Sequence, residues 1–347
     1  MAKKSQKGEV MEELLRNYFL RAGYYVARGV PFNYEGFDVT DIDLWLYGRT
    51  SSVSREIAIV DIKNKRTPQA IERIFWVKGL QSAVKATNAL VATTDKRVEV
   101  KDFGKEQGVL VLDGNFISRL SRSENVLNSR LSEEELIAEI DDYALGKLDG
   151  DWKGRYIESK KLLAKGLNFD NCNMWLEHAR FFAEQASLNT VHRNLAYRLC
   201  FLICSYIVLA VDFMLREMSF GEKEDIEKKI NDGFKYGNRG LRGTNSIISA
   251  SVALVEQFAD NGSVVSGQVR KNLETELSKL PVNILSEYLS KPDVGKSLFG
   301  ISINLEKLAM QKQFTSHSTS SIEVRSLLGC FLDYWQLDRR NFAAENA

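Results

Sequence analysis

The sequence contains few of the residues that mark several protein classes. Its 347 residues include only 4 Cys, 4 Pro and 3 His. So little cysteine and proline excludes a disulfide-stapled miniprotein and a collagen-like chain. The four cysteines form no Cys-x-x-Cys pair. They are typical of buried thiols in a reducing compartment, and we expect a cytoplasmic protein. Cys200 and Cys204 are one helical turn apart, but without a second pair at ligand spacing we favour core packing over a zinc site.

Net charge is also nearly absent. The chain has 47 Lys and Arg against 46 Asp and Glu, a balance of +1, which excludes overall basicity as a sign of a nucleic-acid partner. The charges are unevenly distributed. Residues 1–122 contain 20 basic and 15 acidic side chains, and the remaining residues contain 27 and 31. The N-terminal third is therefore the basic part.

No apolar run reaches the length of a membrane span. The longest, Leu199–Val211, has 13 residues between Arg198 and Asp212, whereas a bilayer span needs about 20. This stretch predicts a buried helix, with a membrane role as the less favoured alternative. We therefore expect no membrane partner.

Helical and strand patterns alternate over the first 120 residues. Helical patterns cover 8–22, 67–87 and 96–107, and strand-like runs cover 24–28, 44–47, 57–60, 89–93 and 109–112. This alternation predicts an α/β sheet with parallel strands. Beyond residue 123 the patterns are almost entirely helical. Together with the length of the chain, this predicts two domains, an α/β domain over 1–122 and an all-α domain over 123–347.

Charged residues stand at the ends of two of these strands. The apolar run 57–60 ends in Asp61 and Lys63, which the two-residue period of a strand places on one face. Upstream, Asp41 and Asp43 lead into the strand at 44–47. Carboxylates that meet at the end of a sheet repel one another, and a divalent cation relieves that repulsion. Oxygen ligands favour Mg²⁺, which binds through one or two carboxylates and keeps sites for water and a phosphate.

The order of these features resembles the PD-(D/E)XK nucleases, the restriction-endonuclease-like superfamily, and in particular its Holliday-junction-resolvase and Mrr-like branches. The chain has a helix, a Gly-Tyr pair, an Asp-Ile-Asp-Leu run and a strand that ends in Asp-x-Lys. Ile42 stands where the family often has proline, and Asp61 where this branch often has Glu. The resemblance covers residues 7–122. It implies a restriction-endonuclease-like core, a mixed sheet flanked by helices.

The resemblance also implies roles for individual residues. Asp43 and Asp61 match the family's metal-binding acids, joined by the Ile62 carbonyl, and Lys63 matches its catalytic lysine. Glu12, on the first helix, matches the acid that completes the metal or water shell. The implied cofactor is Mg²⁺, with Mn²⁺ as the alternative.

Three further residues are expected to contact nucleic acid. Lys65 and Arg66 follow Lys63 in a basic run, where contacts with phosphates would be independent of base sequence. A solvated loop is the alternative for this run. Gln81 lies on the next helix, where many relatives have a Gln.

The sequence therefore predicts a Mg²⁺-dependent endonuclease. By resemblance the expected substrate is DNA, although no residue distinguishes DNA from RNA, and a role in defence against foreign DNA follows by analogy alone. The helical domain is expected to supply target recognition, dimerisation or a surface for a partner protein. Two alternatives stay open. One is a catalytically silent nuclease-like protein that binds nucleic acid or acts as a scaffold. The other is a glycosyltransferase, because Asp41 and Asp43 form a metal-binding Asp-x-Asp motif.

Overall fold

The computed structural model describes residues 7–65, 69–123 and 129–343. The chain divides into two compact units, the first made of residues 1–166, 201–203 and 305–315, and the second of residues 167–200, 204–304 and 316–347. The first unit extends beyond residue 122, where the sequence analysis places the end of the first domain.

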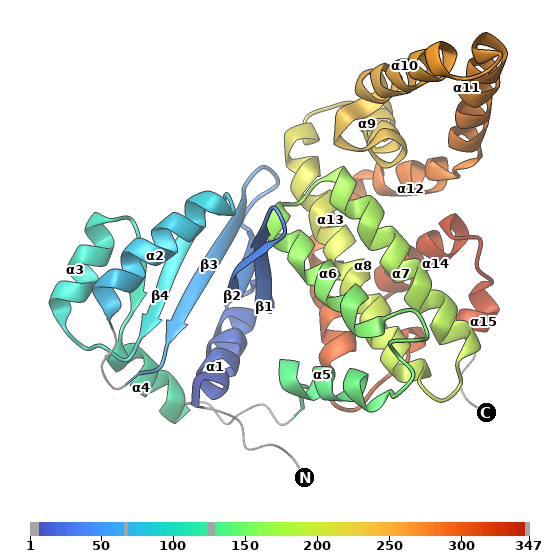
Figure 1. Ribbon diagram of the computed structural model, residues 1–347. Helices are drawn as coiled ribbons and strands as arrows, with labels where there is room; N and C mark the ends of the chain where they lie inside the picture. The colour runs from blue at the N-terminus through green and yellow to red at the C-terminus, as the bar shows by residue number, and fades with distance from the viewer. Residues whose placement is uncertain (1–6, 66–68, 124–128, 344–347) are drawn as a thin grey trace. The chain divides into compact units, whose positions relative to one another are not determined.

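A five-stranded mixed sheet forms the centre of the first unit (Figure 1). Its strands are β1 (Tyr25–Tyr34), β2 (Phe37–Arg49), β3 (Arg55–Lys63), β4 (Asn88–Thr93) and β5 (Leu110–Leu112). They lie in the order β1-β2-β3-β4-β5. The pairs β1–β2 and β2–β3 are antiparallel, and β3–β4 and β4–β5 are parallel. The predicted α/β sheet with parallel members is therefore confirmed.

Helices cover both faces of this sheet (Figure 1). One face is covered by α1 (Lys7–Arg21) and α4 (Gly114–Ser123), and the other by α2 (Ala70–Ala83) and α3 (Val98–Glu106). The crossovers β3-α2-β4 and β4-α3-β5 advance in the same direction across the sheet. Because such crossovers are right-handed, both place their helix on the same face.

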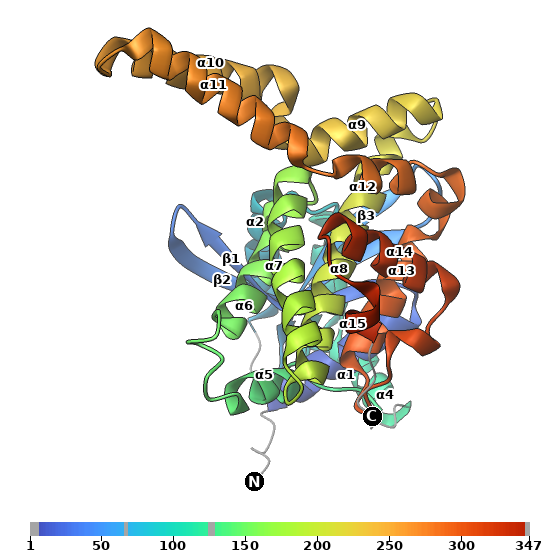
Figure 2. The same cartoon turned by 90° about the vertical axis from the view of Figure 1, so that its right-hand side faces the viewer.

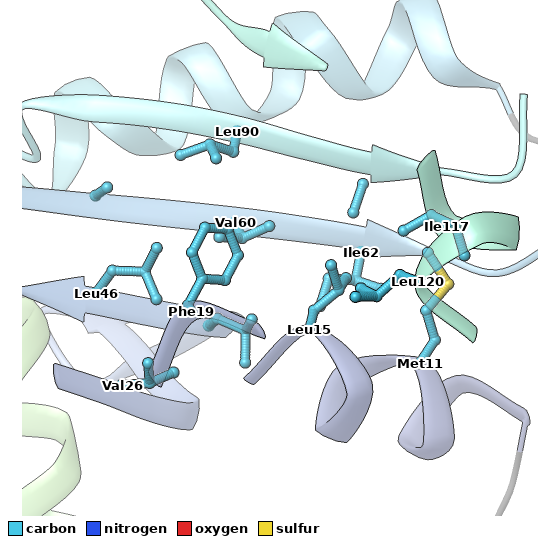
Figure 3. Close-up of a cluster of buried hydrophobic side chains, with 13 residues drawn as sticks. Met11, Leu15, Phe19, Val26, Leu46, Val60, Ile62, Leu90, Ile117 and Leu120 are labelled. Atoms are coloured by element: carbon cyan, nitrogen blue, oxygen red, sulfur yellow. The ribbon is translucent and has the colours of Figure 1, made fainter. Parts of the chain in front are cut away.

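The side chains between α1 and the sheet form a continuous apolar core (Figure 3). Met11, Leu15 and Phe19 recur at helical spacing and pack on Val60 and Ile62, among others. Helix α1 ends where the sequence predicts. Gly23 has a φ of 88°, and the N–H of the next residue donates to the Phe19 carbonyl, as in a Schellman cap.

Strands β1 and β2 are longer than their sequence pattern predicts, and they form an extended hairpin (Figure 2). The sequence analysis expects strands only over 24–28 and 44–47. Gly29, Pro31 and Asp38 are poor strand residues, yet all three lie within the hairpin. Pairing with the neighbouring strand, as between Pro31 and Asp41, holds these residues in extended conformation despite their low strand propensity.

Buried ion pairs join the α/β core to segments from later in the chain. Arg28 on β1 donates to Glu134 on α5 (Glu133–Asp142), with an N–O distance of 2.7 Å. Arg16 on α1 contacts Glu306 at 3.1 Å. Arg16 and Arg28 are almost fully buried, so loss of either partner would leave an uncompensated charge. These ion pairs connect α1 and β1 to parts of the chain that the sequence analysis assigns to the helical domain.

The described residues beyond the sheet and its covering helices are mainly helical, as predicted, with one isolated β-bridge between Arg130 and Gln311. The remaining α-helices are α6 (Trp152–Lys165), α7 (Phe169–Leu188), α8 (Arg193–Leu215), α9 (Lys223–Tyr236), α10 (Gly240–Phe258), α11 (Gly262–Lys279), α12 (Val282–Leu289), α13 (Pro292–Met310), α14 (Ile322–Tyr334) and α15 (Arg339–Ala343). Three short 3-10 helices cover Arg216–Met218, Gly237–Arg239 and His317–Thr319. Helices α10 and α11 pack against each other as a pair (Figures 1 and 2).

Helix α8 contains the apolar stretch singled out in the sequence. Together with the turn that follows, Arg193–Met218 is long and apolar enough to cross a membrane, and 83% of its most apolar window is buried inside the protein. Every residue from Leu199 to Val211 is buried, which confirms the predicted buried helix. Cys200 and Cys204 are free thiols in this interior, and burial raises the pKa of Cys204 well above its usual value. They pack as core residues.

The core between α1 and the sheet can be tested with Leu15, which is completely buried. We expect Leu15→Ala to lower the free energy of unfolding by about 2–5 kcal/mol, because it removes apolar contacts and leaves a cavity. Urea denaturation followed by circular dichroism measures the change. Val10→Ala on the same helix is the control, because Val10 is 50% exposed. A loss for Leu15→Ala no larger than for Val10→Ala would contradict the packing described.

Candidate active site

Asp43 and Asp61 face each other on neighbouring strands. In the antiparallel pairing of β2 and β3, Leu44 lies opposite Val60. One step further along both strands, the same register brings Asp43 opposite Asp61. Since side chains alternate between faces, both acids lie on the face opposite the apolar core of α1. The two carboxylates that the sequence analysis singled out therefore share one edge and one face of the sheet.

The Asp43 carboxylate is partly buried and sits in a negative field. Its Oδ2 accepts a hydrogen bond from the backbone N–H of Ile62, with an N–O distance of 2.5 Å. Burial raises the pKa of Asp43 from 3.8 to about 7, and the charges of Asp61 and Glu12 act in the same direction. The Ile62 N–H and the Lys63 ammonium act against this rise. Near neutral pH, Asp43 is thus poised between its acid and its carboxylate, which makes it sensitive to any added positive charge.

Asp61 is paired with an arginine that the sequence analysis did not identify. Nε of Arg73, on α2, donates to Oδ2 of Asp61 at 2.8 Å, and a terminal nitrogen of the same guanidinium donates to Oδ1. The Asp61 side chain is 7% exposed and that of Arg73 is 24% exposed. The Arg73 guanidinium also lies over the Trp76 ring, 5.4 Å from its centroid. Both oxygens of Asp61 therefore accept from one fork-shaped cation.

Lys63 follows Asp61 on the same face of β3 and is half-buried. Among the described residues its ammonium forms no ion pair, although its charge acts on Asp43. Lys65 is exposed, and its carbonyl accepts a hydrogen bond from the Thr94 hydroxyl at 2.6 Å. This bond joins the residues that follow β3 to the residue that follows β4. Arg66 lies outside the described residues.

Glu12 projects from α1 and is held by Arg28 of β1. The Arg28 Nε donates to Glu12 at 2.7 Å, and the same guanidinium also contacts Glu13 and Glu134. Burial raises the pKa of Glu12, while Arg28 lowers it. The carboxylate is close enough to Asp43 to raise the pKa of that residue as well. Glu12 thus belongs to the electrostatic environment of the site, but Arg28 is its hydrogen-bond partner.

Gln81 lies apart from these residues. Its amide Nε2 donates to the Thr87 carbonyl at 2.9 Å, and the Thr87 N–H donates to the Ile57 carbonyl. Ile57 lies near the start of β3, whereas Asp61 and Lys63 lie at its end. At about 3.3 Å per strand residue, six residues separate these ends by roughly 20 Å. The structure therefore does not group Gln81 with the other candidate residues, and its amide supports the turn between α2 and β4.

The sequence offers one signal that could have identified Arg73. Helix α2 buries a stripe that includes Ala70, Ile74 and Val77. Arg73 directly precedes Ile74, so it lies at the border of this buried stripe. A charged side chain at such a border either extends to water or pairs with an opposite charge on the sheet. Because α2 directly follows the strand that carries Asp61, the Asp61 carboxylate is a partner that Arg73 can reach.

The pair of acids offers hard oxygen donors for one cation. Within the described residues, no group of three or more His, Cys, Asp and Glu side chains is arranged to hold a metal ion. Mg²⁺ does not require such a group, since it binds through one or two carboxylates and fills its remaining positions with water and phosphate. Burial is the main cause of the raised pKa of Asp43, and the negative charges of Asp61 and Glu12 add to it. Asp43 and Asp61 therefore fit a Mg²⁺ site, provided that Arg73 leaves the Asp61 oxygens.

The raised pKa of Asp43 predicts a dependence of stability on pH. The unfolded chain loses this proton near pH 3.8 and the folded chain near pH 7, so Asp43 lowers stability progressively as pH rises between these values. Asp43→Asn removes this effect and keeps an oxygen for the Ile62 N–H. We expect the variant to gain about 1–4 kcal/mol over the wild type at pH 8, and less at pH 5.

Urea denaturation at pH 5 and pH 8, without added divalent metal, measures this difference. Asp41→Asn is the control, because Asp41 is exposed on the same strand. It should keep the pH profile of the wild type. If the free energy of unfolding of Asp43→Asn changed with pH as much as that of the wild type, the raised pKa of Asp43 would be contradicted.

Comparisons of the chain with protein-family models, curated proteins and solved structures find no match. The arrangement of the site residues is therefore the basis for inferring a function.

Proposed function

We propose that this protein is a metal-dependent nuclease that hydrolyses phosphodiester bonds, with Asp43, Asp61 and Lys63 at its active site. The observation that carries the proposal is the facing pair of Asp43 and Asp61 at the end of β2 and β3, with the Lys63 ammonium acting on the same carboxylate. Two carboxylates and one amine on one face of a sheet edge form the donor set that such chemistry uses.

Each residue has a distinct role in this proposal. Asp43 and Asp61 hold Mg²⁺ or Mn²⁺, with the Ile62 carbonyl as a further ligand. When bound, the metal ion polarises the phosphate and lowers the pKa of water. Lys63 orients the attacking water and stabilises negative charge that develops on the phosphate. Glu12, which Arg28 holds on the α1 side of the sheet, acts on Asp43 through its negative charge.

The substrate class follows from the family resemblance and from the basic residues beside the site. Lys65 is exposed directly after the Asp-x-Lys strand, where it can contact a phosphate backbone without reading bases. DNA is the proposed substrate, on the resemblance alone. Target recognition, dimerisation or partner binding is assigned to the helical part, and defence against foreign DNA in the cytoplasm is the biological setting that we infer.

A catalytically silent, nucleic-acid-binding relative is the second candidate, and one observation favours it. Both oxygens of Asp61 accept from Arg73, so the metal ligand that the proposal requires has a protein partner. A protein that has lost catalysis could keep this ion pair as a structural element. The two candidates differ in whether metal-dependent cleavage occurs.

We expect the purified protein to cleave plasmid or oligonucleotide DNA when Mg²⁺ or Mn²⁺ is present and to lose activity with EDTA. Asp43→Ala, Asp61→Ala and Lys63→Ala should each lower the cleavage rate about 100-fold or more, because each removes a group that acts on the scissile phosphate or its metal. Gel-based cleavage assays on folded variants measure these rates.

Two variants serve as matched controls. Asp41→Ala removes an exposed acid two residues from Asp43, and Lys85→Ala removes an exposed lysine on the loop before β4. Both should keep wild-type rates. Full activity of Lys63→Ala would refute the proposed site. Binding of nucleic acid without cleavage would favour the silent candidate, and transfer of sugar from a nucleotide-sugar, lost in Asp41→Ala, would favour the glycosyltransferase alternative.

A further inference from the structure

Arg73 occupies the position where a bound cation would neutralise Asp61. Its Nε and a terminal nitrogen each donate to a different oxygen of that carboxylate. This two-point contact leaves neither Asp61 oxygen without a donor. A divalent ion needs at least one of these oxygens as an inner ligand. The guanidinium and the metal ion therefore compete for the same acceptor atoms.

Arg73 neutralises the charge of Asp61 but not that of Asp43. Arg73 reaches Asp61 from α2, whereas Asp43 lies on the neighbouring strand β2. The donor to Asp43 is the backbone N–H of Ile62, at 2.5 Å, which carries no full positive charge. A single +1 charge on one carboxylate thus leaves a negative charge between the two strands. A divalent ion between Asp43 and Asp61 would neutralise both.

Arg73 also contacts a second group, the Trp76 ring. Its guanidinium lies over the face of Trp76, one turn further along α2, and the side chain is partly exposed. Trp76 is 43% exposed, so its ring borders on solvent. An arginine that leaves Asp61 can keep its cation–π contact and regain water. Release from Asp61 therefore does not bury an unpaired charge.

We propose that Arg73 is an internal counter-ion that closes the metal site, and that a divalent cation binds Asp43 and Asp61 only when Arg73 has swung away from Asp61. This inference rests on the proposed function and describes how the same site is regulated. It makes Arg73 a positioning residue that acts through Asp61. Metal affinity then equals the intrinsic affinity of the open site multiplied by the fraction of molecules in which Arg73 is released.

Isothermal titration calorimetry with Mn²⁺ on the whole 347-residue chain tests this proposal. If about one molecule in ten has the site open, Arg73→Ala should bind Mn²⁺ about tenfold more tightly than the wild type. Arg73→Gln keeps most of the side-chain length and removes the charge, so it should give the same increase. Without metal, both variants should melt at a lower temperature than the wild type, and Mn²⁺ should raise their melting temperatures more than that of the wild type.

Arg339→Ala is the matched control. Arg339 and Asp333 form the same two-point pair, with distances of 2.8 and 2.5 Å, in the second unit. Its removal should leave Mn²⁺ affinity unchanged. Adding Asp43→Ala to each Arg73 variant should abolish the gain, which would locate the bound ion.

The outcomes separate this inference from the proposed function. Equal Mn²⁺ affinity of wild type and both Arg73 variants, lost in each with Asp43→Ala, would overturn the role of Arg73 and leave the metal site standing. Weaker binding by folded Arg73 variants would also overturn it. Absence of Mn²⁺ binding in the wild type and in both variants would overturn the metal site itself. Binding by the variants and not by the wild type would support the inference most strongly.

Discussion

The cost of burying Asp43 as a carboxylate, next to the second carboxylate of Asp61, is the constraint on which the site depends. The apolar registers of β2 and β3 bring both acids to one edge and one face of the sheet, in a partly buried setting where charge is costly. Three interactions offset part of this cost. The backbone N–H of Ile62 donates to Asp43, the Arg73 guanidinium donates to both oxygens of Asp61, and the positive charge of Lys63 acts on Asp43. Asp43 nevertheless keeps a raised pKa, so the compensation is partial.

Under the proposed function, partial compensation distinguishes a metal site from a purely structural ion pair. A fully neutralised cluster would add to stability and leave nothing for a ligand to gain. In the proposed site the remaining negative charge would favour binding of a divalent ion. The partly exposed Arg73 side chain and the exposed Trp76 ring would let the displaced guanidinium reach solvent. In this view the stability lost through Asp43 is linked to the affinity for metal, because the same interaction energy appears in both.

The opposite face of the sheet has a different electrostatic design. Arg28 and Arg16 are nearly fully buried and are matched by several carboxylates, among them Glu12, Glu134 and Glu306. This network connects α1 and β1 to α5 and to residues near the end of α13, which belong to the same compact unit. It also fixes the position of Glu12, so the acid expected in the metal shell is held by a structural cation.

The sequence by itself determined the local features: the helix that ends at Gly23, the apolar strands at 57–60 and 89–93, the buried helix around Leu199–Val211, and the shared face of Asp61 and Lys63. These depend on periodicity and capping, which act over a few residues. Only the tertiary structure decided which partners the charges have. Arg73 on Asp61, Arg28 on Glu12, and Gln81 at the far end of β3 all depend on contacts between elements distant in the chain. A charged side chain pairs with whatever opposite charge the packing brings within reach, and that proximity has no local signature in the sequence.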